Sequence, residues 1–280
     1  MTLKQALDKK LISCEIKNNS KSTHFQTPIS VSITNLTDKN LTIKIDKGLY
    51  FYPQDSNLQN IIIVKDFEIP VMANAKGIEK NLNGYCCESH DGAPGSKPMK
   101  YTIGKQSSGK MKSLVDYLYS HKLYNNMEAQ RAIWTISDNH DLADISGYDT
   151  SSTKKLQLFL SKLTGKKLPP PPAPDDYHRN YYSNTYVSKI SISGNYNINY
   201  SDTCDIRMAM FDTANVCVRE LFVDRHLKPG PHNIKYEFDA SQFPHRYYFI
   251  RMVINDEIKT NSMYDLKTGK IKRVMQLHNR

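Results

Sequence analysis

The residues of this chain best suited to chemistry are two adjacent cysteines, Cys86 and Cys87, followed closely by His90. A cysteine beside a histidine can act as a nucleophile, because the imidazole takes up the thiol proton. Both residue types also bind zinc, but zinc needs three or four protein ligands and no second Cys/His pair lies nearby, so we expect no metal site. His121 and His140 are isolated in the sequence. The alternatives are a cysteine nucleophile with a distant histidine, or a buried thiol without a chemical role.

A second segment of interest reads Ala129-Gln-Arg-Ala-Ile-Trp134. Together with Tyr85-Cys-Cys-Glu88 it resembles bacterial surface thioester domains. The resemblance implies an internal thioester between a cysteine and Gln130, an activated acyl group that would capture an amine as a lasting amide. Because the cysteine is doubled, the matching residue is either Cys86 or Cys87. The alternative interpretation is a buried thiol beside a helix whose tryptophan anchors the core.

The elements that would position these residues are strands followed by helices. Alternating apolar residues predict strands at 13–16, 29–35 and 41–46, the last two paired as a hairpin through a turn at 35–40. The apolar run at 59–64 is typical of a strand covered on both faces. Helical spacing of apolar residues then predicts three helices, at 114–121, 128–136 and 153–164.

A proline-rich stretch separates this half from the next. Five of the six residues 169–174 are proline, which favours an extended chain that joins neither a sheet nor a helix. We therefore predict a semi-rigid linker over 166–185. Beyond it, period-two alternation at 196–200 and 234–238 and a Pro-Gly turn at 228–232 predict a small immunoglobulin-like sandwich over 186–266.

The C-terminal half contains the short segments Met210-Phe-Asp212, Arg219-Glu-Leu221, Pro229-Gly-Pro-His232, Phe238-Asp239 and Tyr247-Tyr-Phe-Ile-Arg251. Through these segments it resembles the immunoglobulin-like domains of flagellar hook caps and the sorting domains at the ends of proteins secreted by Bacteroidetes. This resemblance implies docking or assembly rather than catalysis. A sorting domain would end the chain, whereas here a basic tail, 267–280, follows with five Lys or Arg and no acid.

Charge and composition restrict the partners and the compartment. The net charge of +10 favours acidic partners such as nucleic acid or anionic glycans, although it is spread along the chain. No segment approaches the run of about 18 apolar residues that spans a bilayer. The charged, amphipathic start is unlike a secretory signal, so we expect a cytoplasmic protein, or a surface or secreted one if a signal was removed.

The cysteine count predicts no disulfide framework, because five is odd and the spacing is irregular. Cys204 and Cys217 flank one predicted hairpin, so they could pair, or both could be reduced and buried. The five cysteines are Cys14, Cys86, Cys87, Cys204 and Cys217.

These observations predict a mainly β chain with two domains. The first, 1–165, is a β-sandwich with added helices, and the linker, the immunoglobulin-like β-sandwich and the basic tail follow. The predicted function is a non-enzymatic structural, adhesive or assembly protein of a Bacteroidetes-like bacterium that binds a protein, glycan or filament partner and needs no cofactor. The alternatives are a reactive domain using Cys86, Cys87 and Gln130, as a thioester or as a cysteine nucleophile, and charge-driven binding of nucleic acid.

Overall fold

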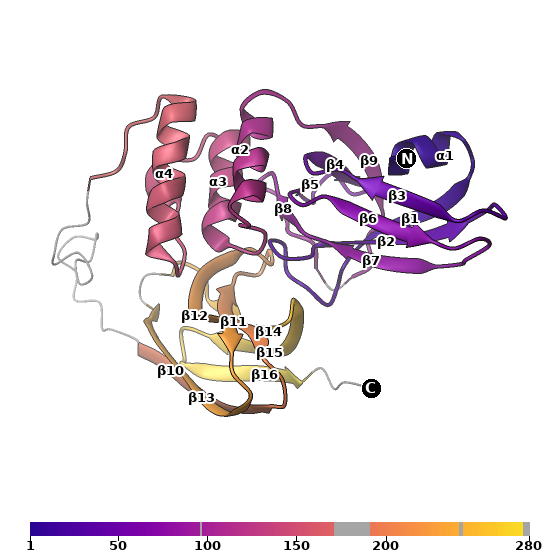
Figure 1. Cartoon of the computed structure of the whole chain (residues 1–280). Helices are drawn as coiled ribbons and strands as arrows, with labels where there is room; N and C mark the ends of the chain where they lie inside the picture. The colour runs from indigo at the N-terminus through magenta and orange to yellow at the C-terminus, as the bar shows by residue number, and fades with distance from the viewer. Residues whose placement is uncertain (96, 171–190, 241–242, 277–280) are drawn as a thin grey trace.

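The structure, a computed structural model, describes residues 1–95, 97–170, 191–240 and 243–276. It is mainly β, as the sequence predicted, and the strands pair antiparallel in several small sheets. Three helices lie beside the sheets of the N-terminal half, and the strands of the C-terminal half lie below these helices in Figure 1. No helix in the described ranges is both long and apolar enough to cross a bilayer.

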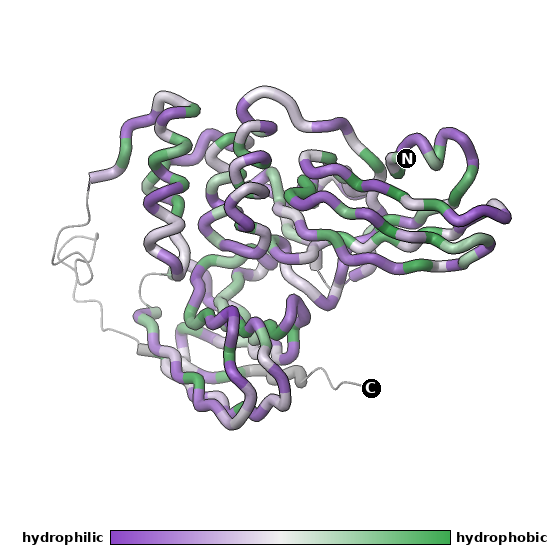
Figure 2. Tube along the Cα trace, viewed as in Figure 1, coloured by the Kyte–Doolittle hydropathy of each residue, from purple (hydrophilic) through white to green (hydrophobic). Residues whose placement is uncertain are grey.

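The N-terminal half begins with the short helix α1 (Leu3–Asp8) and continues as three sheets. Hydrophobic and hydrophilic residues alternate along several of their strands (Figure 2), which is the pattern of a strand with one buried face. The three-stranded sheet has the order β1 (Ile12–Asn18), β2 (Ile29–Asn35), β7 (Ile78–Leu82); the second pairs β3 (Leu41–Ile45) with β6 (Phe67–Val71); the third has the order β8 (Gly84–Cys86), β5 (Ile61–Ile63), β4 (Leu49–Pro53), β9 (Tyr101–Gln106).

The predicted hairpin between 29–35 and 41–46 is wrong. Strand β2 pairs with β1 and β7, so both of its edges are occupied, whereas β3 pairs with β6 in another sheet. The Asn35 side-chain amide at the end of β2 donates to the backbone carbonyls of Lys39, before β3, and Met72, after β6, and so ties β2 to the β3–β6 pair. The apolar faces of both strands nevertheless share one hydrophobic cluster, which explains why their patterns match.

Strand β5 is covered on both faces, as its continuous apolar run predicted. Ile61, Ile62 and Ile63 are all fully buried. Ile61 and Ile63 lie in the hydrophobic cluster between the N-terminal sheets, and Ile62 lies in a second cluster under the helices. The four-stranded sheet therefore separates two cores.

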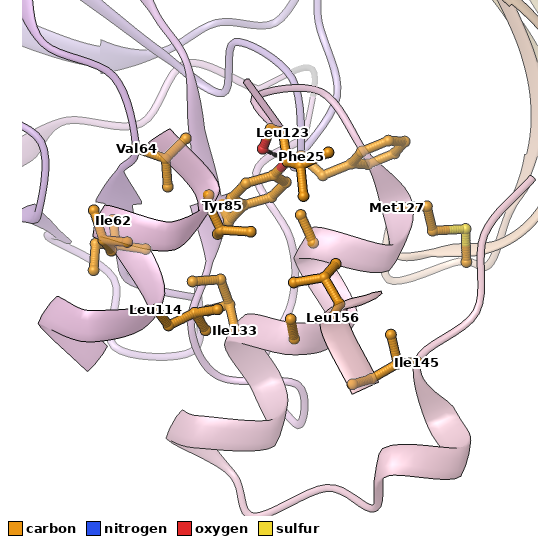
Figure 3. Packing of buried hydrophobic residues seen from close by; sticks show 14 of the residues in the cluster. Phe25, Ile62, Val64, Tyr85, Leu114, Leu123, Met127, Ile133, Ile145 and Leu156 are labelled. Atoms are coloured by element: carbon orange, nitrogen blue, oxygen red, sulfur yellow. Dashed lines mark hydrogen bonds between the residues drawn. The ribbon is translucent and has the colours of Figure 1, made fainter. Parts of the chain in front are cut away.

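The face of the four-stranded sheet that carries Ile62 is covered by the helices α2 (Gly109–Ser120), α3 (Met127–Ser137) and α4 (Thr150–Thr164), which lie close to their predicted bounds. Figure 3 shows Leu114, Ile133 and Leu156 from the three helices gathered near Ile62 and Tyr85 of the sheet. Gly165 ends α4 with φ 80°, a left-handed backbone conformation that glycine adopts without strain. A short 3-10 helix, η1 (Leu142–Asp144), joins α3 to α4.

The C-terminal unit, residues 191–276, consists of two β layers with a third hydrophobic cluster between them. One layer is the ribbon β10 (Ser191–Tyr200) with β13 (Gly230–Asp239), which contributes Tyr236 and Phe238 to that cluster. The other is a five-stranded sheet that runs in the order β12 (Cys217–Leu227), β11 (Cys204–Phe211), β14 (Tyr247–Ile254), β15 (Glu257–Asp265), β16 (Lys270–Gln276).

The segment 267–280 differs from the predicted basic tail. Its residues 270–276 form β16, which pairs with β15 and makes one edge of the five-stranded sheet. The pairing uses backbone groups, so a segment rich in lysine and arginine is compatible with an edge strand. Residues 277–280 and most of the predicted linker lie outside the described residues.

The two halves pack against each other, although a proline spacer led us to expect them to be held apart. Phe211 of β11 and Cys217 of β12 are fully buried in the same cluster as the helices. Arg207 of β11 is 1% exposed, lies 5.1 Å from the Phe25 ring of the N-terminal half, and has its Nε 3.2 Å from a Glu220 carboxylate oxygen. We call this contact region the junction.

Loss of Glu220 should destabilise the protein strongly. None of the Arg207 nitrogens makes a well-aligned hydrogen bond within the described residues, so the nearby carboxylate is the main compensation for the buried charge. We expect Glu220→Ala to lower the free energy of unfolding in urea by about 3–5 kcal/mol. Glu68→Ala, which removes the exposed partner of Lys44, is the matched control, and we expect almost no loss of stability from it. Equal losses in the two variants would contradict this account.

Candidate functional site

Cys86 and Cys87 lie at the end of β8 with their side chains in different cores. Cys86 belongs to the cluster between the N-terminal sheets, and Cys87 belongs to the cluster under the helices. Burial, and then the charge of Glu88, raise the pKa of both thiols well above the usual value. Both are therefore protonated thiols at neutral pH, which is the less reactive form of cysteine.

The side chain of Gln130 lies against Cys86. Its Oε1 accepts the backbone N–H of Cys86 at 3.0 Å and its Nε2 donates to the Cys86 carbonyl at 2.7 Å. Strand β8 is an edge of its sheet, and the next N–H, that of Cys87, donates inward to Asn60 of the neighbouring chain segment. Gln130 thus takes the place of a further strand, and it satisfies two backbone groups that would otherwise be buried without partners.

Tyr85 sets the register of this contact. Its buried hydroxyl donates to the Leu123 carbonyl at 2.8 Å and accepts the backbone N–H of Asn126, the N-cap of α3, at 3.0 Å. Because the start of α3 is fixed to β8, Gln130 faces Cys86 one turn later. The structure therefore brings together two of the three residues that the sequence singled out, Cys86 and Gln130, and places the Cys87 side chain on the opposite face of the strand.

His24, which sequence analysis did not single out, lies beside this pair. Its ring stacks on Trp134 with the centroids 6.0 Å apart and the planes at 11°. Its Nε2 accepts the backbone N–H of Cys217 at 2.8 Å, so it also joins the two halves. Burial, and then the charge of Arg131, lower the pKa of His24 to about 3, while the Gln130 side chain acts in the opposite direction. A lone histidine in a polar segment carries no periodic signal that could have revealed this role.

Trp134 anchors the core, as one interpretation of the sequence expected. It is 1% exposed, and its Nε1 donates to Gln59 at 3.3 Å. Gln59 in turn donates to the Asp91 carbonyl at 2.9 Å, which ties the loop after β8 to the helix.

The histidines near the cysteines do not form a metal centre with them. His90 is exposed while Cys87 is buried, and the described residues contain no group of three or more His, Cys, Asp or Glu that could hold a metal ion. His140 is isolated in the sequence but not in space, since its Nε2 lies 2.8 Å from the hydroxyl of Ser89. The contact joins residues 51 positions apart, which no local pattern predicts.

Cys204 and Cys217 do not pair, although the hairpin between them is present. Cys204 lies opposite Leu227 at the open end of the β11–β12 pair, and Cys217 lies opposite Phe211 beside the turn. The two cysteines are separated by the length of a strand, which is too far for a disulfide. All five cysteines of the chain are free thiols.

The C-terminal unit carries an open cavity of about 540 Å³, lined mainly by residues of β10, β15 and β16. Tyr264 lies at its floor, nearly buried, with its hydroxyl 2.5 Å from that of Tyr236, and Ile271 of β16 stands at its rim with 51% of its surface exposed. We call it the edge groove; it is lined by Ile192, Ser193, Gly194, Asn195, Tyr196, Ser262, Tyr264, Gly269 and Ile271.

Both sides of the edge groove are edge strands. Within the described residues, β10 pairs only with β13, and β16 pairs only with β15. Gly194 on β10 is required for the floor, because a Cβ atom there would lie 2.4 Å from the Tyr236 ring. The groove is thus a gap between two sheet edges, closed below by packed tyrosines.

A second open cavity, between the β3–β6 pair and α2, does not favour an acidic ligand. Three lysines line it, but so do four carboxylates, and Lys47 lies 3.7 Å from Asp66 and 3.5 Å from Asp116. The mixed charge gives no cationic surface for phosphate groups there.

The comparisons with known proteins supply no relative. No family model, no curated protein and no solved structure matches the chain.

His24 predicts an acid-sensitive junction. The pKa of His24 is about 3 in the folded state, against a usual value of about 6.5. Between these two pH values His24 is therefore protonated in the unfolded chain and neutral in the folded chain. His24 therefore contributes stability above about pH 6.5 that is lost as the pH falls toward 3, at about 1.4 kcal/mol per pH unit.

The measurement is urea unfolding between pH 6.5 and 4.5. The wild type should lose stability relative to His24→Gln at the slope given above, while His226→Gln, at an exposed position, should follow the wild type. Parallel curves for the wild type and His24→Gln would show that His24 does not cause the acid sensitivity.

Proposed function

We propose that the protein is a binding or assembly protein that accepts an extended segment of a protein or filament partner in the edge groove. We further propose that its C-terminal unit is an immunoglobulin-like sandwich and its N-terminal half a β-sandwich with added helices. The observation that supports the function is the gap between the edge strands β10 and β16. Edge strands are templates for a further strand, whose backbone would complete the ladder.

The residues at the groove favour a polypeptide over a smaller ligand. Successive side chains of an added strand point alternately inward and outward, so every second one would face the groove. Ile271 and Tyr196 offer contacts for apolar or aromatic side chains, and Ser193 and Asn195 are exposed on β10 beside them. The groove lies away from the junction, so a bound partner would not disturb the contact between the halves.

A peptide library displayed on phage tests this function. Peptides enriched on the wild type should lose at least tenfold in affinity for Ile271→Asp, because the charge would be desolvated at the rim of the groove. Leu158→Asp on α4 is the matched control, since Leu158 is 48% exposed and far from the groove. The affinity of this variant for the enriched peptides should equal that of the wild type.

Two results would overturn the proposal. One is a failure to enrich any peptide that distinguishes Ile271→Asp from the control. The other is a wild-type protein that binds no peptide but binds a glycan on an array, with Ile271→Asp abolishing the glycan binding. The groove would then be a sugar site.

A second candidate function is covalent capture through a thioester between Cys86 and Gln130. The observation that favours it is the position of the Gln130 carboxamide on the backbone of Cys86, the pair that the resemblance to surface thioester domains implied. Formation of the bond would join the Cys86 sulfur to the Gln130 carbonyl carbon and release ammonia, and a lysine amine would later displace the thiol.

Intact mass tests the thioester directly. If the bond forms, the purified protein is lighter than its sequence by one ammonia, about 17 Da, and methylamine or Cys86→Ala abolishes the deficit. Cys87→Ala is the control and keeps the deficit, since its side chain lies on the other face of β8. A mass equal to that of the plain sequence excludes the thioester and leaves Gln130 as the structural partner of β8.

A further inference from the structure

Ser89 and His140 form a nucleophile-and-base pair on the surface of the N-terminal half. The Ser89 hydroxyl lies 2.8 Å from Nε2 of His140. Ser89 follows β8 and His140 follows α3, and these elements end at the same corner because Gln130 fixes α3 to β8. A serine hydroxyl within hydrogen-bond reach of an imidazole is the arrangement of an activated nucleophile.

Both residues are held in place by further contacts. The backbone N–H of Ser89 donates to Oδ2 of Asp138 at 2.6 Å. The His140 carbonyl accepts a hydrogen bond from Nζ of Lys166 at 2.8 Å, and the centroid of the His140 ring lies 6.1 Å from that of the Trp134 ring. The geometry is thus fixed by the loops on both sides and does not depend on the serine–histidine contact alone.

A carboxylate lies on the other side of the imidazole. Oδ2 of Asp144 is 4.0 Å from Nδ1 of His140, and the backbone N–H of Asp141 holds that carboxylate at 3.2 Å. When Ser89 donates its hydroxyl hydrogen to Nε2, the hydrogen of the neutral ring is on Nδ1, toward Asp144. At this distance Asp144 makes no hydrogen bond to the ring, but its charge favours a hydrogen on Nδ1, the tautomer in which His140 can act as a base.

The pair is open to a substrate. The Ser89 residue is partly exposed, and the His140 side chain is 23% exposed. The backbone N–H of His90, the residue after Ser89, makes no hydrogen bond within the described residues. It is the nearest donor in sequence for an oxyanion that forms on a carbonyl attacked by Ser89.

We propose that Ser89, His140 and Asp144 form a site for acyl transfer from neutral or cationic carboxylic esters. The Ser89 oxygen would attack the ester carbonyl while its proton passes to Nε2 of His140, and the same proton would then leave with the alcohol. Water, activated by His140, would hydrolyse the acyl-serine and release the carboxylic acid. The Asp138 carboxylate, which accepts the Ser89 backbone N–H, disfavours anionic esters.

This site is independent of the edge groove and of the thioester, since it uses residues of neither. Ser89 lies three positions after Cys86, but its side chain contacts His140 and not Gln130. Failure of either function proposed above would leave the site unaffected.

The test uses the full-length protein with a neutral alkyl fluorophosphonate and with p-nitrophenyl acetate. The fluorophosphonate should modify Ser89, identified by peptide mass spectrometry, and Ser89→Ala and His140→Gln should lower ester hydrolysis by roughly 10²-fold or more. Asp144→Asn should cause a smaller loss, and p-nitrophenyl succinate, an anionic ester, should react more slowly than the acetate.

Ser120→Ala is the matched control. Ser120 also contacts a histidine, with its hydroxyl 3.0 Å from Nδ1 of His121, but that nitrogen is also 2.9 Å from the Tyr117 carbonyl. The control should keep the full rate and its probe labelling at Ser89. Absence of an adduct on Ser89 in the wild type, or equal hydrolysis by Ser89→Ala and Ser120→Ala with unchanged circular dichroism, would overturn the proposal.

Discussion

The pairing of Gln130 with the backbone of Cys86 is the interaction on which the rest of the structure depends. Strand β8 is an edge strand, but it is buried, so its outward N–H and carbonyl need partners that water cannot provide. A glutamine side chain supplies both hydrogen bonds and fixes α3 across the sheet. An apolar residue at this position would leave two buried polar groups unsatisfied.

Helix α3 then connects three parts of the molecule. Trp134 lies in the cluster between the N-terminal sheets, whereas Ile133 lies in the cluster under the helices. The Arg131 side chain donates a hydrogen bond to the Cys217 carbonyl of the C-terminal unit at 3.5 Å. A helix that is buried on several sides in this way transmits any shift of β8 to the junction, and so it makes the two halves one packed structure.

This arrangement separates the surfaces that could act on other molecules. Strands β11, β12 and β14 contribute residues to the junction or beside it, while the edge groove lies between β10 of the two-stranded ribbon and β15–β16 at the far end of the five-stranded sheet. The serine–histidine pair lies at the opposite end of α3 from its N-cap, outside both cores. Each surface can therefore be altered by substitution without removing the packing that holds the other.

The sequence by itself determined the β-rich class, the three helices and the inward face of each element, because these follow from local periodicity. Short motifs also pointed to Gln130 and to either Cys86 or Cys87, and only the tertiary structure placed Gln130 against Cys86. Strand partners came only from the tertiary structure. Strands β2 and β3 have matching apolar faces whether they lie side by side or in different sheets, and periodicity cannot distinguish these arrangements. The same holds for His24, for Ser89 with His140, and for β16, since contacts between residues far apart in the chain leave no local pattern.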